Sequence, residues 1–449
     1  MSIRVILIFL ILGYVGIQLL IKKMKPLDGY AFLLAFPAIG FDFGLGVNAS
    51  LVVLLFLILL IILTVFEKAR ITPFFNGLTW PVVLFLTYAI IDTVIISTTS
   101  IGAIQVNDDS FLRNEGRFIF QIIRQCLSFS VFLVVPNYVK NRDDLLRTVS
   151  FFMKGLILLA LLGVVQQIIF VLTSIDIIPM MASNDIERVN QQYGYFGVPM
   201  IRICSFGGEP KGFAQLLVIA FYIVTVYETF EIKFVNSKNT FLLLFFVLIV
   251  FTMSTSGFVL WVILYVVSFM LISFFRQGKV NYYMIIIAFV LIATSLFYLD
   301  TFEMIFEDRV ASRDIVNEDF DAVIKEFLQD NPQWIYFGSG LGNIHSLAAS
   351  YIPYDLEFME NAIFVAKSGY LRLISEVGIV GFLLFFVMLV GIVFPIINCR
   401  DNYVIASIIM TIALFIGYMA RGYINEVFLF FLALCNNVGL RKKYGLLIK

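Results

Sequence analysis

Long runs of apolar residues alternate along this chain with shorter polar segments. A helix that crosses a lipid bilayer needs about 20 mainly apolar residues, and these runs are continuously apolar, unlike the alternating strands of a transmembrane barrel. We therefore predict an all-α polytopic membrane protein with about 12–14 transmembrane helices. The runs lie near residues 2–20, 28–46, 49–66, 78–97, 117–137, 149–173, 213–231, 239–253, 257–275, 281–299, 370–398, 402–419 and 423–440.

The polar segments between these runs fall into two classes on opposite sides of the predicted membrane. Because Lys and Arg accumulate in short cytoplasmic loops, the basic class is predicted to face the cytoplasm, with the C-terminus inside and the N-terminus outside. The basic residues also follow the first apolar run, so this run is predicted to be a retained crossing and not a cleaved signal peptide. The basic class carries Lys22, Lys23, Lys25, Lys68, Arg70, Lys140, Arg142, Arg147, Lys233, Lys238, Arg276, Lys279, Arg400, Arg441, Lys442, Lys443 and Lys449.

Three long polar segments lie on the other side, near residues 98–116, 174–212 and 300–369, and carry most of the acidic residues. Loops of this length between helices are usually folded or functional. The predicted organisation is therefore residues 1–299 with about ten transmembrane helices, residues 300–369 as a large outer loop, and residues 370–449 as the C-terminal transmembrane helices. We place the function at the large outer loop.

The large outer loop contains its own helical pattern. An apolar stripe at helical spacing predicts an amphipathic helix on the membrane surface or on the crossing helices, made by Val316, Phe320, Val323, Ile324, Phe327 and Leu328. Asn331-Pro-Gln is expected to end this helix, and Gly338-Ser-Gly-Leu-Gly342 to form a bend. A second short apolar stripe follows at Ile344, Leu347, Ala348 and Tyr351.

The composition supports a membrane protein and excludes several kinds of site. Of the 449 residues, 61% are hydrophobic and only 14% are charged, with a net charge of zero, so nothing suggests a nucleic-acid partner. The four cysteines have no paired short spacing, and the single histidine, His345, excludes a multi-histidine metal site. The three glycines of the bend follow no strand, which favours a tight loop over a nucleotide site. We expect no metal and no cofactor.

Arginines on the predicted outer side are the first candidates for binding. A guanidinium presents a planar fork of donors that matches phosphate oxygens and keeps its charge, so several forks near the lipid headgroups would suit a lipid-linked phosphate or pyrophosphate. The alternative is that each arginine pairs with a nearby carboxylate, which Glu307, Asp308 and Asp314 could provide. The outer arginines are Arg113, Arg117, Arg188, Arg202, Arg309 and Arg313.

Other polar groups on this side could take part in chemistry. Glu209 and Lys211 stand with Arg202 just before a crossing helix, at the predicted membrane boundary. The hydroxyl-rich stretch 253–257 could line the mouth of a polar cavity or could simply be a hairpin turn. His345 could be a general base because its unperturbed pKa lies near neutrality, or it could be an ordinary surface residue.

Three pieces of the sequence follow one another in a characteristic order. The first is Arg202, Phe206 and Glu209-Pro210, ahead of a crossing helix. The second is Ser312-Arg313 with the glycine bend, and the third is Tyr370-Leu371, Glu376, Gly378 and Gly381. In this order they resemble the O-antigen ligase and polymerase superfamily: its turn ahead of a crossing helix, and the start and the end of its large periplasmic loop. The resemblance covers roughly residues 150 to 400.

The resemblance implies a GT-C-like fold in the bacterial inner membrane and metal-independent glycosyl transfer on the periplasmic face. The donor would be a glycan on undecaprenyl pyrophosphate, the acceptor a lipid-linked repeat unit, and a chain-length regulator a possible protein partner. Where the ligases carry histidine and asparagine before the Tyr-Leu pair, this chain has Lys367-Ser368. This departure favours the repeat-unit polymerases (Wzy-type), whose loop motifs vary more.

The resemblance and the chemistry together assign roles to named residues. Arg202 and Arg313 are expected to bind the pyrophosphate, with Arg309 and Arg117 in support. A base for the acceptor hydroxyl could be Lys367, Glu209 or Glu360, and Tyr370 is a further candidate. An O-antigen ligase is the alternative enzyme. A lipid-linked oligosaccharide flippase or transporter, or a scaffold without catalytic activity, is the alternative of another class.

Overall fold

A computed structural model describes most of the chain. The described residues are 3–37, 51–67, 78–99, 117–178, 192–195, 198–252, 254–277, 316–351, 366, 368–420 and 425–443.

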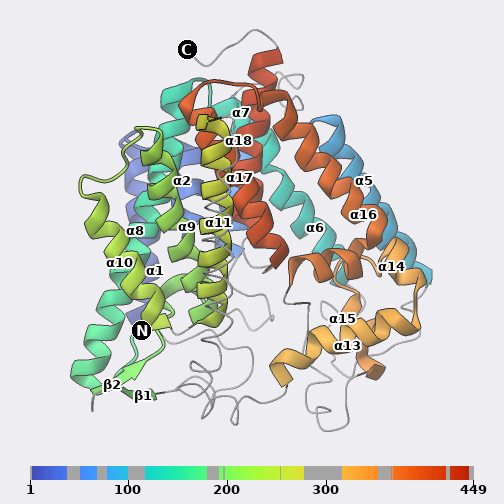
Figure 1. Cartoon of the computed structure of the whole chain (residues 1–449), viewed down its shortest axis with the longest axis horizontal. Helices are drawn as coiled ribbons and strands as arrows, with labels where there is room; N and C mark the ends of the chain where they lie inside the picture. Colours follow the sequence, from blue (N-terminus) through green and yellow to red (C-terminus); the bar gives the residue numbers. More distant parts are fainter. Residues whose placement is uncertain are drawn as a thin grey trace.

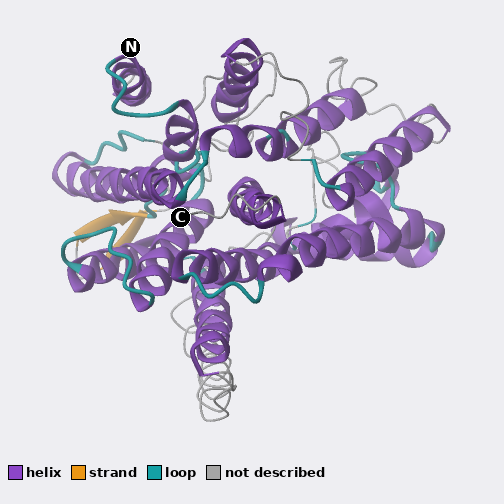
Figure 2. Cartoon of the chain, turned by 90° about the horizontal axis from the view of Figure 1, so that it is seen from above, coloured by secondary structure: helices purple, strands orange, loops and turns teal. Residues whose placement is uncertain are grey.

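Helices make up nearly all of the described chain (Figures 1 and 2). The membrane-sized and flanking helices are α1 (Ile3–Leu20), α2 (Pro26–Leu33), α3 (Leu51–Glu67), α5 (Trp80–Thr99), α6 (Arg117–Phe129), α7 (Val131–Tyr138), α8 (Arg142–Thr173), α9 (Pro210–Thr229), α10 (Lys238–Thr252), α11 (Thr255–Gln277), α16 (Gly369–Val393), α17 (Asn402–Ala420) and α18 (Asn425–Lys443). The short elements are β1 (Gln192–Tyr195), β2 (Val198–Ile201), α13 (Val316–Asp330), α14 (Gln333–Phe337) and α15 (Ile344–Leu347), with 3-10 turns at Ser205–Gly207, Ala349–Tyr351 and Phe394–Ile396.

The described helices are those of a multi-pass membrane protein. Seven of them are long and apolar enough to cross a membrane, and three more apolar helices are shorter, at Val5–Leu20, Leu55–Val65 and Lys238–Thr252. Helix α18 lies where a crossing near 423–440 was predicted, and the crossing predicted near 281–299 falls outside the described residues. The antiparallel hairpin β1–β2 is a small local departure from an all-helical chain.

One predicted crossing does not have the expected length. A continuous helix near 28–46 was expected, but α2 ends at Leu33 and the chain turns through Leu34 and Ala35. Pro37 gives the reason, because its ring would clash with the carbonyl of Leu33 in a continued helix and because it disfavours helical geometry at Phe36. The sequence prediction overlooked this proline.

The bundle has two ends that differ in what they carry. The hairpin β1–β2 and helices α13 and α15 gather at one end, and the C-terminus lies at the other (Figure 1). We call these the loop end and the C-terminal end. The two predicted classes of polar segment also lie at different ends. The segments after α1 and α9, which belong to the basic class, lie at the C-terminal end. The segment after α8, one of the three long polar segments, lies at the loop end.

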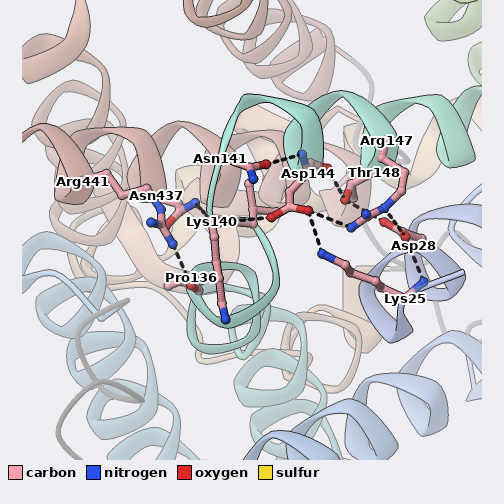
Figure 3. Close-up of polar contacts among 11 residues, drawn as sticks. Lys25, Asp28, Pro136, Lys140, Asn141, Asp144, Arg147, Thr148, Asn437 and Arg441 are labelled. Atoms are coloured by element: carbon pink, nitrogen blue, oxygen red, sulfur yellow. Dashed lines mark hydrogen bonds and ion pairs between the residues drawn. The ribbon is translucent and has the colours of Figure 1, made fainter. Parts of the chain in front are cut away.

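A bonded group of charged residues fixes the C-terminal end (Figure 3). Lys25 Nζ lies 2.7 Å from Asp144 Oδ1, and Arg147 reaches both Asp28 (Nε to Oδ2, 2.8 Å) and Asp144 (NH2 to Oδ1, 3.0 Å). The Thr148 hydroxyl donates to the second oxygen of Asp28 at 2.9 Å. We call Lys25, Asp28, Asp144 and Arg147 the C-terminal charge group. It joins α2 and the start of α8, and both carboxylates are buried.

The segment α13–α15 has its own small core, which confirms the predicted amphipathic helix. Val323, Ile324, Phe327 and Leu328 of α13 are buried, together with Ile344, Leu347 and Ala348 of the second predicted stripe. This core also includes Ile96 of α5 and Leu371 of α16. The large loop is therefore packed onto two membrane helices in the part that the structure describes.

Candidate functional site at the loop end

The predicted glycine bend lies against a break in helix α16. Gly378 interrupts the helix with φ 67° and ψ −178°. In a continuous helix the carbonyls of Ser375 and Glu376 would accept from residues four positions later. Here Ser339 donates to Ser375 O from its backbone nitrogen (2.8 Å) and its hydroxyl (2.7 Å), and Gly340 N donates to Glu376 O (2.9 Å). The bend thus replaces the helical partners that the break removes.

Helix α5 holds the same segment from a second side. The Tyr88 hydroxyl donates to Phe337 O at 3.0 Å, and Leu341 N donates to the Thr93 hydroxyl at 2.9 Å. The Asn343 side chain donates to the Ser97 hydroxyl at 3.0 Å. Three successive turns of α5 therefore fix the position of the bend relative to α16.

Glycine is required where these two backbones meet. Gly338 and Gly378 both have positive φ, and a Cβ on Gly338 would lie only 2.5 Å from Glu376 O. A Cβ on Gly378 would overlap the carbonyl oxygen of Tyr336. The tight bend predicted from the glycines is confirmed, and its physical role is close approach to α16.

Four charged side chains from three helices gather beside this break. Arg372 Nε lies 3.3 Å from Glu376 Oε1 on α16, and Arg124 NH2 of α6 lies 3.5 Å from Glu426 Oε1 of α18. Glu426 is also close enough to Arg372 to interact with it electrostatically. We call Arg124, Arg372, Glu376 and Glu426 the loop-end charge group. Ionisable residues among membrane helices are expensive and usually functional.

Tight packing brings these helices together. A Cβ on Gly369 would overlap the carbonyl oxygen of Tyr418, so the start of α16 touches the end of α17. The Tyr418 ring stacks on Phe428 of α18, with ring centroids 6.0 Å apart and planes 2° apart.

Arg372 keeps capacity for another anion. It contacts Glu376 through Nε only, and its side chain is 29% exposed. The two terminal nitrogens of the guanidinium take part in no hydrogen bond with the part of the chain that the structure describes. A guanidinium with two free donors can bind two oxygens of one phosphate.

The segment around Arg202 and Glu209 occupies the same end. Arg202 Nε donates to Thr252 O, the last carbonyl of α10, at 3.3 Å. Glu209 precedes α9 in an extended conformation, half-buried, and its carbonyl accepts from Phe213 N at 2.9 Å. Thr252 and Thr255 end and begin the neighbouring helices, so the stretch 253–257 contains the hairpin turn that was one of its two predicted roles.

A buried glutamine of α8 organises this segment. Gln166 is fully buried, and its oxygen accepts from Ser205 N at 2.8 Å. Its amide nitrogen donates to Asp176 Oδ1 and to Ile178 O, both at 2.9 Å. One side chain therefore ties the chain that leaves α8 to the chain that leads into Arg202 and α9.

The predicted site residues are described to different extents. Arg202, Glu209 and Tyr370 have described side chains at the loop end, and Tyr370, the second residue of α16, is 44% exposed. Arg117 begins α6 and His345 lies in α15, but their side chains are not described. The remaining candidates lie outside the described residues and stay predictions: Arg309, Arg313, Glu360, Lys367, Arg113 and Arg188.

Sequence reasoning missed Arg124, Arg372 and Glu426. Each is an ionisable residue inside or beside an apolar run, and the runs were treated as nearly free of charge. The available signal was the presence of an ionisable residue within a crossing helix, which is a functional hypothesis by default.

Comparisons with known proteins add no family to this picture. No protein-family model matches the chain, and no curated protein matches it. A function for this chain is therefore inferred from its own residues.

Proposed function

We propose that this protein is a metal-independent glycosyltransferase of the Wzy type that polymerises repeat units of a bacterial polysaccharide. It would transfer a glycan from undecaprenyl pyrophosphate onto a lipid-linked repeat unit at the outer leaflet. The observation that carries this proposal is the broken helix α16, which presents Arg372 beside a docked polar loop at the end of a membrane bundle. The described residues of the three sequence resemblances, at 202–210, 338–342 and 370–381, lie at the loop end of the bundle.

The reaction needs an environment that stabilises a leaving pyrophosphate. The bond between the donor's anomeric carbon and a pyrophosphate oxygen breaks, and the acceptor hydroxyl forms the new bond to that carbon. The hydroxyl proton passes to a base, and negative charge grows on the departing pyrophosphate. Preorganised guanidinium groups stabilise such charge most strongly where water is scarce.

Arg372 and Arg202 are the described residues assigned to the pyrophosphate. Arg372 has unused donors and a fixed position, and Arg202 contacts the end of α10, also at the loop end of the bundle. Arg313, Arg309 and Arg117 remain predicted additions. Among the candidates for the base, Glu209 is the one whose side chain the structure describes. It lies seven residues after Arg202, at the start of α9. Lys367 and Glu360 remain the alternatives.

The docked loop supports a reaction that depends on positioning. Two lipid-linked substrates must meet with the acceptor oxygen aligned on the anomeric carbon, and correct alignment alone can contribute about 7–11 kcal/mol to lowering a barrier. The segment α13–α15 is fastened to α5 and α16 by hydrogen bonds and by its own core. It therefore offers a rigid surface next to the proposed pyrophosphate site.

A lipid flippase is the rival that one observation favours, because transporters often contain discontinuous helices. In transporters these breaks lie near the middle of the membrane. The break at Gly378 instead lies in the loop-end half of α16, where the bend from the large loop fills it. An O-antigen ligase would use the same end and the same kind of donor, so only its product distinguishes it.

Deleting the gene in its host and examining the surface glycan on a gel separates these functions. A polymerase mutant should show single repeat units on their acceptor, and a ligase mutant should show no surface glycan. A flippase mutant should accumulate lipid-linked units on the cytoplasmic side. Either of the last two results would contradict the proposal.

Point variants test the site itself. Arg372→Ala and Arg202→Ala should each lower the yield of long chains by about a hundredfold, since one group that stabilises developing charge typically contributes this much. Arg441→Ala removes an arginine at the opposite end, where it donates to Pro136 O, and should leave the ladder unchanged. Normal long chains in Arg372→Ala would overturn the assigned site.

A further inference from the structure

A polar cleft lies at the C-terminal end of the bundle, away from the proposed active site. Its volume is about 590 Å³, and the ends of α9 and α11 and the connection from α16 to α17 enclose it. The polar side chains that line it are Glu231, Arg276, Asn398, Arg400 and Asn402. Neither the sequence motifs nor the proposed reaction uses this cleft.

The two arginines give the cleft a capacity for an anion. Arg276 is held in place, with NH2 donating to Thr229 O at 2.6 Å and its guanidinium 5.8 Å from the centre of the Phe230 ring. Arg400 is exposed and forms no hydrogen bond or ion pair with the described residues. Glu231 is the single acid in the lining, and it forms no ion pair with either arginine within the described chain. With two arginines and one glutamate, the lining carries one net positive charge.

The lining of the cleft also has an apolar part, made by Phe230, Phe275, Ile397 and Ile405. We call these four residues its apolar wall. The Asn402 side chain donates to Phe230 O at 3.3 Å and so joins α17 to the end of α9. A small soluble anion would use only the polar side of such a cleft. An amphiphile with an anionic head and an apolar body would use both sides.

We propose that this cleft binds the phosphate of an anionic phospholipid headgroup between Arg276 and Arg400, with the glycerol and upper acyl carbons against the apolar wall. Anionic lipids gather in the leaflet that faces basic loops, and this end carries the predicted cytoplasmic loops. The lipid would link α9, α11 and α17, which are three helices of the central bundle. This inference is independent of the proposed glycosyl transfer.

Titration of the purified, delipidated full-length protein tests the proposal, with bound lipid counted by native mass spectrometry. The wild type should bind dioleoylphosphatidylglycerol more tightly than dioleoylphosphatidylcholine. Arg400→Gln should weaken binding of the anionic lipid about tenfold, the effect of losing one charge-assisted hydrogen bond. Lys23→Ala removes an exposed charge at the same end, outside the cleft, and should bind the lipid as the wild type does.

Two results would overturn the proposal. If Arg400→Gln and Lys23→Ala weaken lipid binding equally, general surface charge accounts for the binding. If inorganic phosphate or glycerol 3-phosphate binds with the same dependence on Arg400 and the lipid shows no advantage, the ligand is a soluble phosphate. The thermal midpoint of each variant is recorded alongside, and Arg400→Lys, which keeps the charge, should retain part of the affinity if the variant chain is folded.

Discussion

The two ends of the bundle carry charge groups of the same composition and different geometry. Each group has two basic and two acidic side chains. In the C-terminal charge group the ion-pair distances are 2.7 to 3.0 Å, and in the loop-end charge group they are 3.3 and 3.5 Å. Charge balance alone therefore does not tell a structural group from a candidate ligand-binding group. The number and length of the bonds distinguish them.

At the C-terminal end, both oxygens of each buried carboxylate accept hydrogen bonds. Asp144 accepts from Lys25, from Arg147 and from the backbone of Lys140, and Asp28 accepts from Arg147, from Thr148 and from the backbone of Lys25 (Figure 3). At the loop end, the two terminal nitrogens of Arg372 donate no hydrogen bond to the described chain. A saturated group stabilises the fold, whereas an unsaturated one can bind a ligand.

Breaking the saturated group should have the largest effect on stability. Asp28→Ala leaves Arg147 and Thr148 without their shared acceptor, and its free energy of unfolding should fall by about 3 kcal/mol, near the lower limit for a broken buried pair because Arg147 is partly exposed. Denaturation in detergent measures the loss. Asp143→Ala, at an exposed position on α8, the helix of Arg147, should change stability by less than about 0.5 kcal/mol. Equal losses in both variants would show that the bonded geometry contributes little.

A substitution at the break in α16 should have the next largest effect on stability, and this effect should be local. In Gly378→Ala an alanine must adopt a backbone conformation that costs on the order of 1–3 kcal/mol, and its Cβ meets the carbonyl of Tyr336. Hydrogen exchange should quicken at the amides of Ser339 and Gly340, which bond to α16, and stay unchanged at the C-terminal end.

Gly16→Ala provides the matched control for this variant. Nothing lies within 4 Å of a Cβ at Gly16 in α1, so the substitution should be neutral or slightly stabilising. Unchanged exchange at Ser339 and Gly340 in Gly378→Ala would contradict the docking of the bend into the break.

Gln166 lies at the loop end, but its side-chain amide is fully hydrogen-bonded. It therefore tests whether bonding or location in the bundle decides the effect of a substitution on stability. Gln166→Leu removes the hydrogen bonds to Asp176, Ile178 and Cys204 Sγ and leaves Ser205 N without its acceptor, so stability should fall by about 1–2 kcal/mol in thermal or chemical unfolding. The neighbouring Gln167 has buried amide atoms with no partner among the described residues. Gln167→Leu should therefore be neutral or stabilising. A larger loss in Gln167→Leu than in Gln166→Leu would reverse the argument.

Local patterns in the sequence predicted much of the fold. Continuous apolar runs predicted the crossing helices, a helical stripe predicted the buried face of α13, and three glycines predicted the bend. Each of these depends on residues close together in the chain. Pro37 carried a readable local signal for the end of α2, which was overlooked.

The site could be predicted only in part, because it depends on contacts between distant segments. Gly378 lies in a run that is apolar on both sides, and only the bend some forty residues earlier explains the break. Arg372 and Glu376 are an i,i+4 pair that the sequence could have shown, but Arg124 and Glu426 come near them only because α6, α16 and α18 pack together. The sequence of one helix does not show partners on another helix.

The smallest effect is expected at the pair Arg124–Glu426. Its closest atoms are 3.5 Å apart, and the Arg124 side chain is 36% exposed, so a double-mutant cycle to alanine should give a coupling energy below about 1 kcal/mol. The same cycle on Arg147 and Asp28, joined at 2.8 Å with a buried carboxylate, should give a clearly larger value. Both cycles are measured by unfolding in the same detergent. Equal coupling energies would mean that the loop-end charge group also stabilises the fold. The argument that Arg372 binds a ligand would then fail. The opposite result is a weak coupling between Arg124 and Glu426 together with loss of the polymer ladder in Arg372→Ala. It would show that the loop-end charge group contributes to ligand binding and little to stability.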